Sequence, residues 1–245
     1  MSPGRTSQTR ASTTFGHSAR PLVIAPSTSR TCKAPPTGLA PHSRTCEPPK
    51  RVKNDLADEP RSSGAMLLNL WAALQGIVGL EAYAKALASL SPEDRQEITD
   101  AQAISWVRMQ TSYKLVEAAA LAAGRDPDTV YDESVRRSAQ LTYRGVWKVL
   151  LRFASPDTLL TRASMMYSKS RNWGKLQAAL LGEGSAELRI TEWPQMPERY
   201  IRAIAISSAT ILEIAGQRKA AYTFVTTRDG AVIRMRWGKG LTPSP

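Results

Sequence analysis

The fold is decided by the stretch from Lys175 to Trp237, which ends in YTFVTTRDGAVIRMRW (residues 222–237). Within it, Asp229-Gly230 is a strong two-residue hairpin signal, because both residues tolerate positive φ; it joins expected strands at 219–227 and 231–237. The second strand has an apolar face and a mainly charged face, formed by Ile233, Met235 and Trp237 and by Val232, Arg234 and Arg236. This period of two predicts an antiparallel strand with one face in water.

A second hairpin and a helix complete this unit. Gly182-Glu183-Gly184-Ser185 joins the expected strands 175–181 and 186–193. Between the hairpins, Pro197 suits the first turn of a helix and Gly216 its end. Apolar and small residues recur there at helical spacing, and three residues are expected to face water: Arg199, Arg202 and Glu213. The sequence therefore predicts an α/β (α+β) fold, with a helical layer packed on a four-stranded antiparallel sheet made of two hairpins joined by a helix.

The composition changes near residue 65. Residues 1–64 are rich in Ser, Thr, Pro and Arg and contain no Trp, which predicts a disordered basic tail, 1–64. A single domain is expected over 65–237, with a flexible C-terminal tail at 238–245. Because a new pattern begins at Met66, we expect Met66 to be the true initiator; a transit segment and a basic nucleic-acid arm are the alternatives.

Both histidines and both cysteines lie in that tail: His17, His42, Cys32 and Cys46. The expected domain therefore lacks the residues for Ser-His-Asp and Cys-His catalysis, for thiolate or imidazole zinc sites, and for haem held by a proximal His. It also has no dinucleotide or Walker-type glycine motif. We expect no enzyme activity, no cofactor and no metal.

The net charge of +12 is shared between the two parts, with 10 basic and 4 acidic residues in 1–64 and 23 basic and 17 acidic residues after it. The domain alone is thus only mildly basic, which weakens a nucleic-acid interpretation. No apolar run is long enough to span a bilayer, so we expect a cytoplasmic protein with no membrane partner.

Helices are expected before the sheet. Ser91, Asp126 and Ser155 are each followed by Pro and an acidic residue, a pattern typical of helix starts. Capping accounts for Glu93 and Asp94 without catalysis. Further expected features are a short helix broken around Gly76 and Gly79, one helical region over about 126–154 bent at Gly145, and a helix over 158–173. On the long region, four residues share one face, either solvated or in contact with phosphate or an acidic partner: Arg137, Arg144, Lys148 and Arg152.

The order of elements and three motifs resemble a known group of proteins. The motifs are Ala118-Ala119-Ala120 followed by Gly124-Arg125-Asp126-Pro127, Arg152-Phe153-Ala154-Ser155-Pro156-Asp157, and the terminal Arg234-Met235-Arg236-Trp237. Over Gly76–Trp237 the chain resembles an uncharacterised myxobacterial family of about 200-residue proteins. It is more distantly similar to 4-vinyl-reductase-type small-molecule-binding domains and to the NO-signalling/Golgi-transport ligand-binding superfamily. The resemblance implies helices on an antiparallel sheet, frequent dimers and an apolar ligand cavity. Residues 226–231 lack the cysteines common in the 4-vinyl-reductase type, so it implies no metal role.

The favoured prediction is a non-enzymatic small-molecule-binding or signalling domain with an apolar cavity for a small hydrophobic ligand, and a homodimer is a further expectation. Its candidate ligand-binding residues lie where helices should meet the sheet: Trp106, Met109, Tyr113, Trp147, Met165, Met166 and Trp193. For each of them, ordinary core packing is the competing interpretation. The alternative function is a nucleic-acid or acidic-partner module that uses the tail with Arg189, Arg234 and Arg236; the face of the sheet on which Tyr222 and Phe224 lie is left open.

Overall fold

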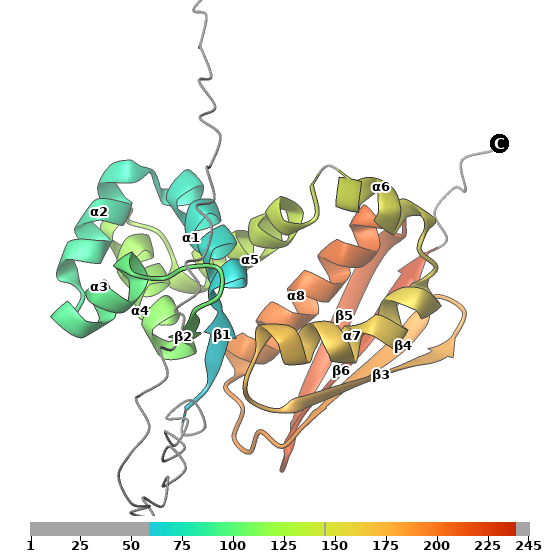
Figure 1. Cartoon of the computed structure of the whole chain (residues 1–245). Helices are drawn as coiled ribbons and strands as arrows, with labels where there is room; N and C mark the ends of the chain where they lie inside the picture. The colour runs from blue at the N-terminus through green and yellow to red at the C-terminus, as the bar shows by residue number, and fades with distance from the viewer. Residues whose placement is uncertain (1–58, 145, 239–245) are drawn as a thin grey trace, which may run out of the picture. The chain divides into compact units, whose positions relative to one another are not determined.

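The C-terminal sheet has the strand order β3-β4-β6-β5 and is antiparallel throughout (Figure 1). The computed structural model describes residues 59–144 and 146–238, without the side chains of 146–148. The four strands are β3 (Lys175–Gly182), β4 (Ser185–Thr191), β5 (Arg218–Thr227) and β6 (Gly230–Gly238). Helix α8 (Glu198–Ile214) joins the two hairpins. The predicted fold class is therefore confirmed.

The hairpin between β3 and β4 requires glycine at one position. Gly184 has a φ of +72°, a backbone conformation that residues with a side chain adopt at a cost. A Cβ at this position would also lie 2.5 Å from the carbonyl oxygen of Trp237, whose backbone N–H donates to the carbonyl oxygen of Gly184 at 2.8 Å. The Gly182–Ser185 turn thus places β4 tightly beside β6.

Seven further helices fall within the described residues (Figure 1). They are α1 (Gly64–Val78), α2 (Leu80–Ser89), α3 (Pro92–Thr99), α4 (Met109–Ala122), α5 (Pro127–Thr142), α6 (Val146–Phe153) and α7 (Pro156–Ser170). The three predicted caps are confirmed: Ser91, Asp126 and Ser155 each accept a hydrogen bond from a backbone N–H three residues on.

Two helix predictions need correction. The region 126–154 holds two helices, α5 ending at Thr142 and α6 beginning at Val146, rather than one bent helix. Helix α1 runs through Gly76 and ends before Gly79, whose φ of +85° stops it. Gly76 remains helical while the Arg137 side chain lies over it, 3.3 Å from the place of a Cβ.

Strands β1 (Arg61–Ser63) and β2 (Trp106–Arg108) form a second, two-stranded antiparallel sheet. Ser62 is buried and bridges to Arg171 at the end of α7. The folded part therefore begins before residue 65, because β1 obtains its partners from residues more than 40 positions away. Of the tails predicted at 1–64 and 238–245, residues 1–58 and 239–245 lie outside the described residues.

Helix α8 is buried on two sides. One side packs with α7 and the sheet through Ile204, Ala205 and Ala209, and the other packs with α1, α4 and α5 through Ala203 and Ile206. The prediction that Arg202 faces water is wrong, since its guanidinium binds Asp128 and Asp132 of α5 at 2.7 and 2.8 Å. Helix α8 thus connects the two apolar cores.

Candidate ligand cavity

A cavity of about 400 Å³ lies among α1, α5, α6, α7, α8 and the inner face of the sheet. This volume falls within the roughly 300–1,000 Å³ typical of small-molecule sites. Most of its lining is apolar, including Leu159, Leu160, Ala163, Met166, Leu176, Ala186, Leu188, Ile204, Ile211, Leu212, Met235 and Trp237. The molecule therefore holds a space suited to an apolar ligand at the junction of helices and sheet.

Local sequence periodicity explains how these side chains meet. On α7, Leu159, Ala163 and Met166 recur at spacings of four and three, so they share one helix face. On the strands the lining residues are two apart, as Ala186 and Leu188 are on β4, and therefore point to the same side of the sheet. The helix period and the strand period thus direct both sets into one space.

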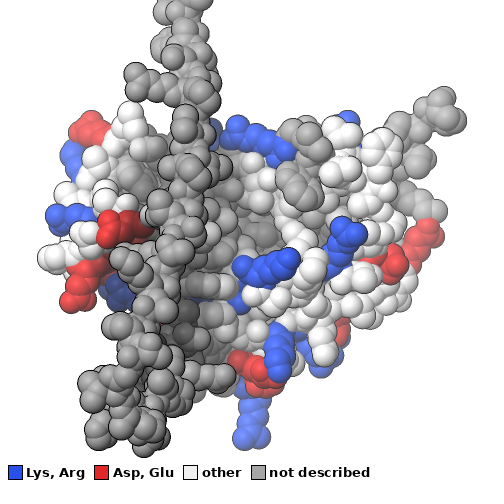
Figure 2. Space-filling view, viewed as in Figure 1, with Lys and Arg blue, Asp and Glu red and all other residues white. Residues whose placement is uncertain are grey.

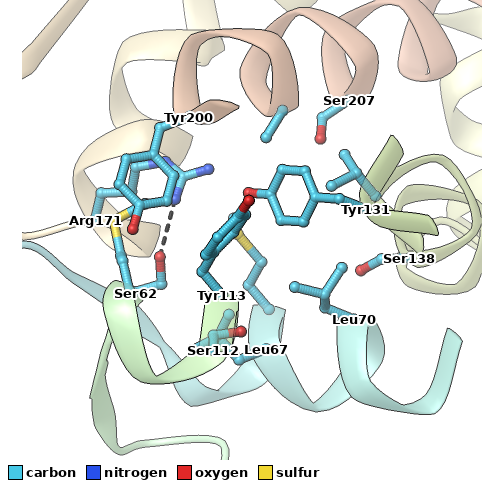
Figure 3. A pocket seen from close by; sticks show the side chains of 14 residues that line it. Ser62, Leu67, Leu70, Ser112, Tyr113, Tyr131, Ser138, Arg171, Tyr200 and Ser207 are labelled. Carbon is cyan, nitrogen blue, oxygen red and sulfur yellow. Dashed lines mark hydrogen bonds between the residues drawn. The ribbon is translucent and has the colours of Figure 1, made fainter. Parts of the chain in front are cut away.

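A smaller cavity of about 50 Å³ adjoins the first one. The two share four lining residues: Met66, Ser138, Arg171 and Ser207. Figure 3 shows tyrosine and serine side chains around the smaller space, so its wall is more polar. It has room for one or a few water molecules beside several hydrogen-bonding groups.

Arg171 is the main charged group at the junction of the two cavities. Its side chain is only 9% exposed. One guanidinium nitrogen donates to Ser62 Oγ at 2.9 Å (Figure 3), and the Cζ atom lies 5.9 Å from the Tyr167 ring centroid. Its Nε–H is buried without a hydrogen-bond partner, and no carboxylate among the described residues forms an ion pair with it. A buried cation without a counter-charge is costly, so this wall favours an anion.

The tyrosines around the cavities stay neutral. Burial raises the pKa of Tyr167 to about 12, although nearby Arg171 acts in the opposite direction. Burial likewise raises the pKa of Tyr131 and of Tyr200. The Tyr167 hydroxyl donates to the carbonyl oxygen of Trp173 at 3.0 Å. These phenols are therefore hydrogen-bonding groups rather than phenolates at neutral pH.

A second buried polar cluster surrounds Asp94 on α3. Its carboxylate accepts hydrogen bonds from Thr111 at 2.8 Å, Lys114 at 2.7 Å and Arg108 at 3.0 Å. Burial alone raises the pKa of Asp94, but hydrogen bonds from Lys114, Thr111 and Ser91 lower it to about 2. Capping therefore does not fully account for Asp94, which also ties α3 to α4. All its oxygens have partners within the fold, so the cluster is structural.

The seven residues predicted from sequence do not form one group. Met166 lines the larger cavity, and Met109 and Tyr113 line the smaller one. Trp193 is 3% exposed in the core beside Tyr200, Trp106 lies on β2, and Met165 is half exposed on α7. Trp147 belongs to α6, and its side chain lies outside the described residues.

The sequence prediction omitted Arg171 and the serines at the junction of the cavities. Arg171 follows a run of short polar and basic residues, Ser168-Lys169-Ser170, and resembles an ordinary helix end. Only its contact with Ser62, 109 residues away, shows that it is buried. Its one sequence signal is its place between an apolar helix and an apolar strand.

Comparison with solved structures identifies the fold. The H-NOX protein from K. algicida, solved as Fe(II) without ligand, is 10% identical with a TM-score of 0.56 and covers 74% of this chain and 100% of its own. The H-NOX protein from S. oneidensis, solved in an Fe(II)NO ligation state, is 13% identical with a TM-score of 0.56, covering 72% of this chain and 99% of its own. The chain matches no family model and no curated protein sequence.

The fold is thus similar to that of the solved H-NOX proteins. This agrees with the predicted resemblance to the NO-signalling/Golgi-transport superfamily in fold. At these identities the likeness concerns the fold alone. The narrower resemblances, to the myxobacterial family and to 4-vinyl-reductase-type domains, stay predictions.

Haem is the cofactor that this fold implies, as one neighbour with a TM-score of 0.51 concerns a haem with a distorted porphyrin. Protein ligands to haem iron are His, Cys, Met or Tyr. The described residues include no His or Cys. Tyr167 is a neutral phenol engaged with Trp173. The described residues therefore do not fit a haem held by imidazole or thiolate, and Tyr167 does not offer a phenolate ligand.

Two features are absent from the described residues. In residues 59–144 and 146–238, no helix is long and apolar enough to cross a membrane. Within the same ranges, no three His, Cys, Asp or Glu side chains are grouped to hold a metal ion.

Proposed function

We propose that the chain is a non-enzymatic sensor domain that binds a small amphipathic acid. The apolar part of the ligand would fill the larger cavity, and its acidic group would meet Arg171. The observation that carries this proposal is the guanidinium of Arg171, buried without a carboxylate partner at the wall of a mainly apolar space.

The chemistry of the wall selects the ligand class. A guanidinium presents several N–H donors in a plane and binds carboxylates or phosphates well. Ser138 and Ser207, which line both cavities, add hydroxyl groups near the same junction. An apolar molecule without an acid would leave the Arg171 charge uncompensated. The best match is therefore a molecule with an alkyl or aromatic body and one carboxylate.

The predicted site residues take different parts in this proposal. Met166 would contact the apolar body of the ligand, and Met109 and Tyr113 would border the polar end. Trp106, Met165 and Trp193 line neither cavity, so this proposal gives them no ligand contact, and Trp147 stays a predicted ligand-binding residue.

Helix α8 offers a route from ligand to response. Ile204 and Ile211 line the larger cavity, whereas Ala203 and Ile206 of the same helix pack against the helical core. A ligand that shifts α8 would therefore disturb both cores. Signalling of this kind, a cytoplasmic location and a homodimer remain predictions within the proposal.

The experiment compares dodecanoate with dodecanol by isothermal titration calorimetry. The two probes share an alkyl chain and differ in charge. Wild type should bind dodecanoate about tenfold or more tightly than dodecanol, since a charged hydrogen bond contributes about 1.5–3 kcal/mol. Replacing Arg171 by Met (Arg171→Met) should remove this preference. Equal affinities for both probes in wild type would refute the role of Arg171.

Adjacent methionines provide a matched pair of variants. Met166→Trp places a bulky ring in the cavity and should abolish binding, while Met165→Trp makes the same change at a half-exposed position that lines neither cavity. Circular dichroism melting checks that both variants fold. Binding that survives Met166→Trp unchanged would place the ligand elsewhere.

The alternative nucleic-acid function has less support. Tyr222 and Phe224 pack against the apolar core, so they are not placed to stack bases beside the arginines of the outer face. On that face Glu187 pairs with Arg189 at 2.8 Å and with Arg234 at 3.4 Å, which offsets part of the positive charge. Salt-dependent binding of single-stranded DNA by the full chain, lost on Arg236→Glu, would favour the alternative.

A further inference from the structure

Helix α6 carries an apolar face with no cover among the described residues. Val149 is 55% exposed, Leu150 is 54% exposed and Phe153 is 84% exposed. At 3.6 residues per turn these three side chains span an arc of about 100°. Leu151 lies on the opposite side of the helix and is buried. The helix is thus held to the domain by one face and presents a second apolar face outward.

Basic side chains lie next to this exposed face. A groove of about 650 Å³ is lined by Arg137 of α5, Arg144 of the link between α5 and α6, and Arg152 of α6. None of the three forms an ion pair within the described ranges. The acidic residue of the groove, Glu213, is already paired with Arg136 at 3.2 Å. The groove therefore has positive charge that the fold does not neutralise.

Three occupants can be compared by their chemistry. A second copy of the chain meeting this face through a two-fold axis would bring the same three arginines toward one another, which is unfavourable. A soluble phosphate compound would pair with the arginines but leave Val149, Leu150 and Phe153 in water. An anionic bilayer offers phosphates to the arginines and acyl chains to the apolar residues.

We propose that α6 and the basic groove form a peripheral docking surface for membranes that contain anionic lipids. In Figure 2 the surface at the position of α6 is largely uncharged, with Lys and Arg beside it. The prediction of no membrane partner rested on the lack of a spanning segment, and a surface contact needs none. The docking surface is also independent of the ligand proposed for the cavity.

The test is co-sedimentation of the full chain with two kinds of vesicle. One kind is phosphatidylcholine alone, and the other is phosphatidylcholine mixed with phosphatidylglycerol. Wild type should sediment with the anionic vesicles and release as salt rises. Phe153→Ser should weaken binding about tenfold through lost apolar burial, and Arg144→Glu/Arg152→Glu about tenfold or more through charge.

Two matched controls separate this surface from the rest of the chain. Leu121→Ser removes an apolar side chain that is 65% exposed on α4, and Arg228→Glu reverses a charge in the β5–β6 turn. Both should bind as wild type does. These controls are needed because residues 1–64 are also basic and could hold the chain on anionic vesicles through charge alone.

Three outcomes would overturn the proposal. The first is wild type that stays in solution with anionic vesicles at low salt. The second is binding that Phe153→Ser and the double charge reversal leave unchanged, which would assign it to another part of the chain. The third is a chain that binds inorganic phosphate at these arginines but no vesicle, which would make the groove a site for a soluble anion.

Discussion

Replacing Asp94 by Asn (Asp94→Asn) tests how the helical layer is held together. The change keeps the size of the side chain but removes the charge that Lys114 and Arg108 contact at 2.7 and 3.0 Å. Asp94 is buried, with 4% of its side chain exposed. We therefore expect a clear loss of stability, because two cations lose their shared counter-charge within the fold.

The magnitude follows from the pKa of Asp94. The folded state lowers this pKa from 3.8 to about 2. A shift of one pKa unit corresponds to 1.36 kcal/mol, so the lowered pKa of Asp94 stabilises the folded state by about 2 kcal/mol. Because the pKa is lowered, this contribution is complete above the unfolded value near 4 and is lost as the pH falls through about 2. By pH 3 about half of it should be gone.

Urea unfolding of wild type and Asp94→Asn at several pH values between 7 and 3 measures this effect. The variant should be about 2 kcal/mol less stable at pH 7, and the gap should narrow below pH 4. Glu93→Gln, which removes a charge from the exposed neighbour, is the control and should cost little. A gap under about 0.5 kcal/mol at pH 7, or one that does not change down to pH 3, would refute the reasoning.

Three further predictions concern the fold. Gly184→Ala should destabilise the chain by about 3 kcal/mol in urea unfolding, because its Cβ would meet a carbonyl oxygen at 2.5 Å, whereas Gly124→Ala, with a φ of +64° and open space, should cost only about 1 kcal/mol. A chain that begins at Met66 loses β1 and the hydrogen bond to Arg171, so it should be about 2 kcal/mol less stable than the full chain; equal melting temperatures would contradict this. Ser155→Ala removes the cap of α7 and should cost about 1 kcal/mol, and an unchanged unfolding midpoint would show that the cap contributes nothing.

Local patterns in the sequence were sufficient to predict most of the fold. The Asp229-Gly230 turn and the alternation of apolar and charged residues in β6 predicted the last hairpin, because turn chemistry and a period of two are local properties. The same holds for the caps at Ser91, Asp126 and Ser155, where the hydrogen bond spans only three residues.

Features that depend on distant contacts escaped prediction. Strand β1 is short and polar, and it becomes a strand only through pairing with β2. Arg202 occupies a face of α8 that would be solvated in an isolated helix, yet α5 supplies Asp128 and Asp132 to it. The candidate site also depends on a distant contact, since Arg171 donates a hydrogen bond to Ser62, 109 residues earlier in the chain. The sequence prediction located apolar residues near the cavity but not the charge at its wall.

The most direct test of the central claim is native mass spectrometry of the full chain purified from its own host, beside Met166→Trp prepared in the same way. A small acid bound to wild type and absent from Met166→Trp is the predicted result, and its mass would give the ligand class. Wild type that carries no bound molecule and takes up no dodecanoate when it is supplied would contradict the account.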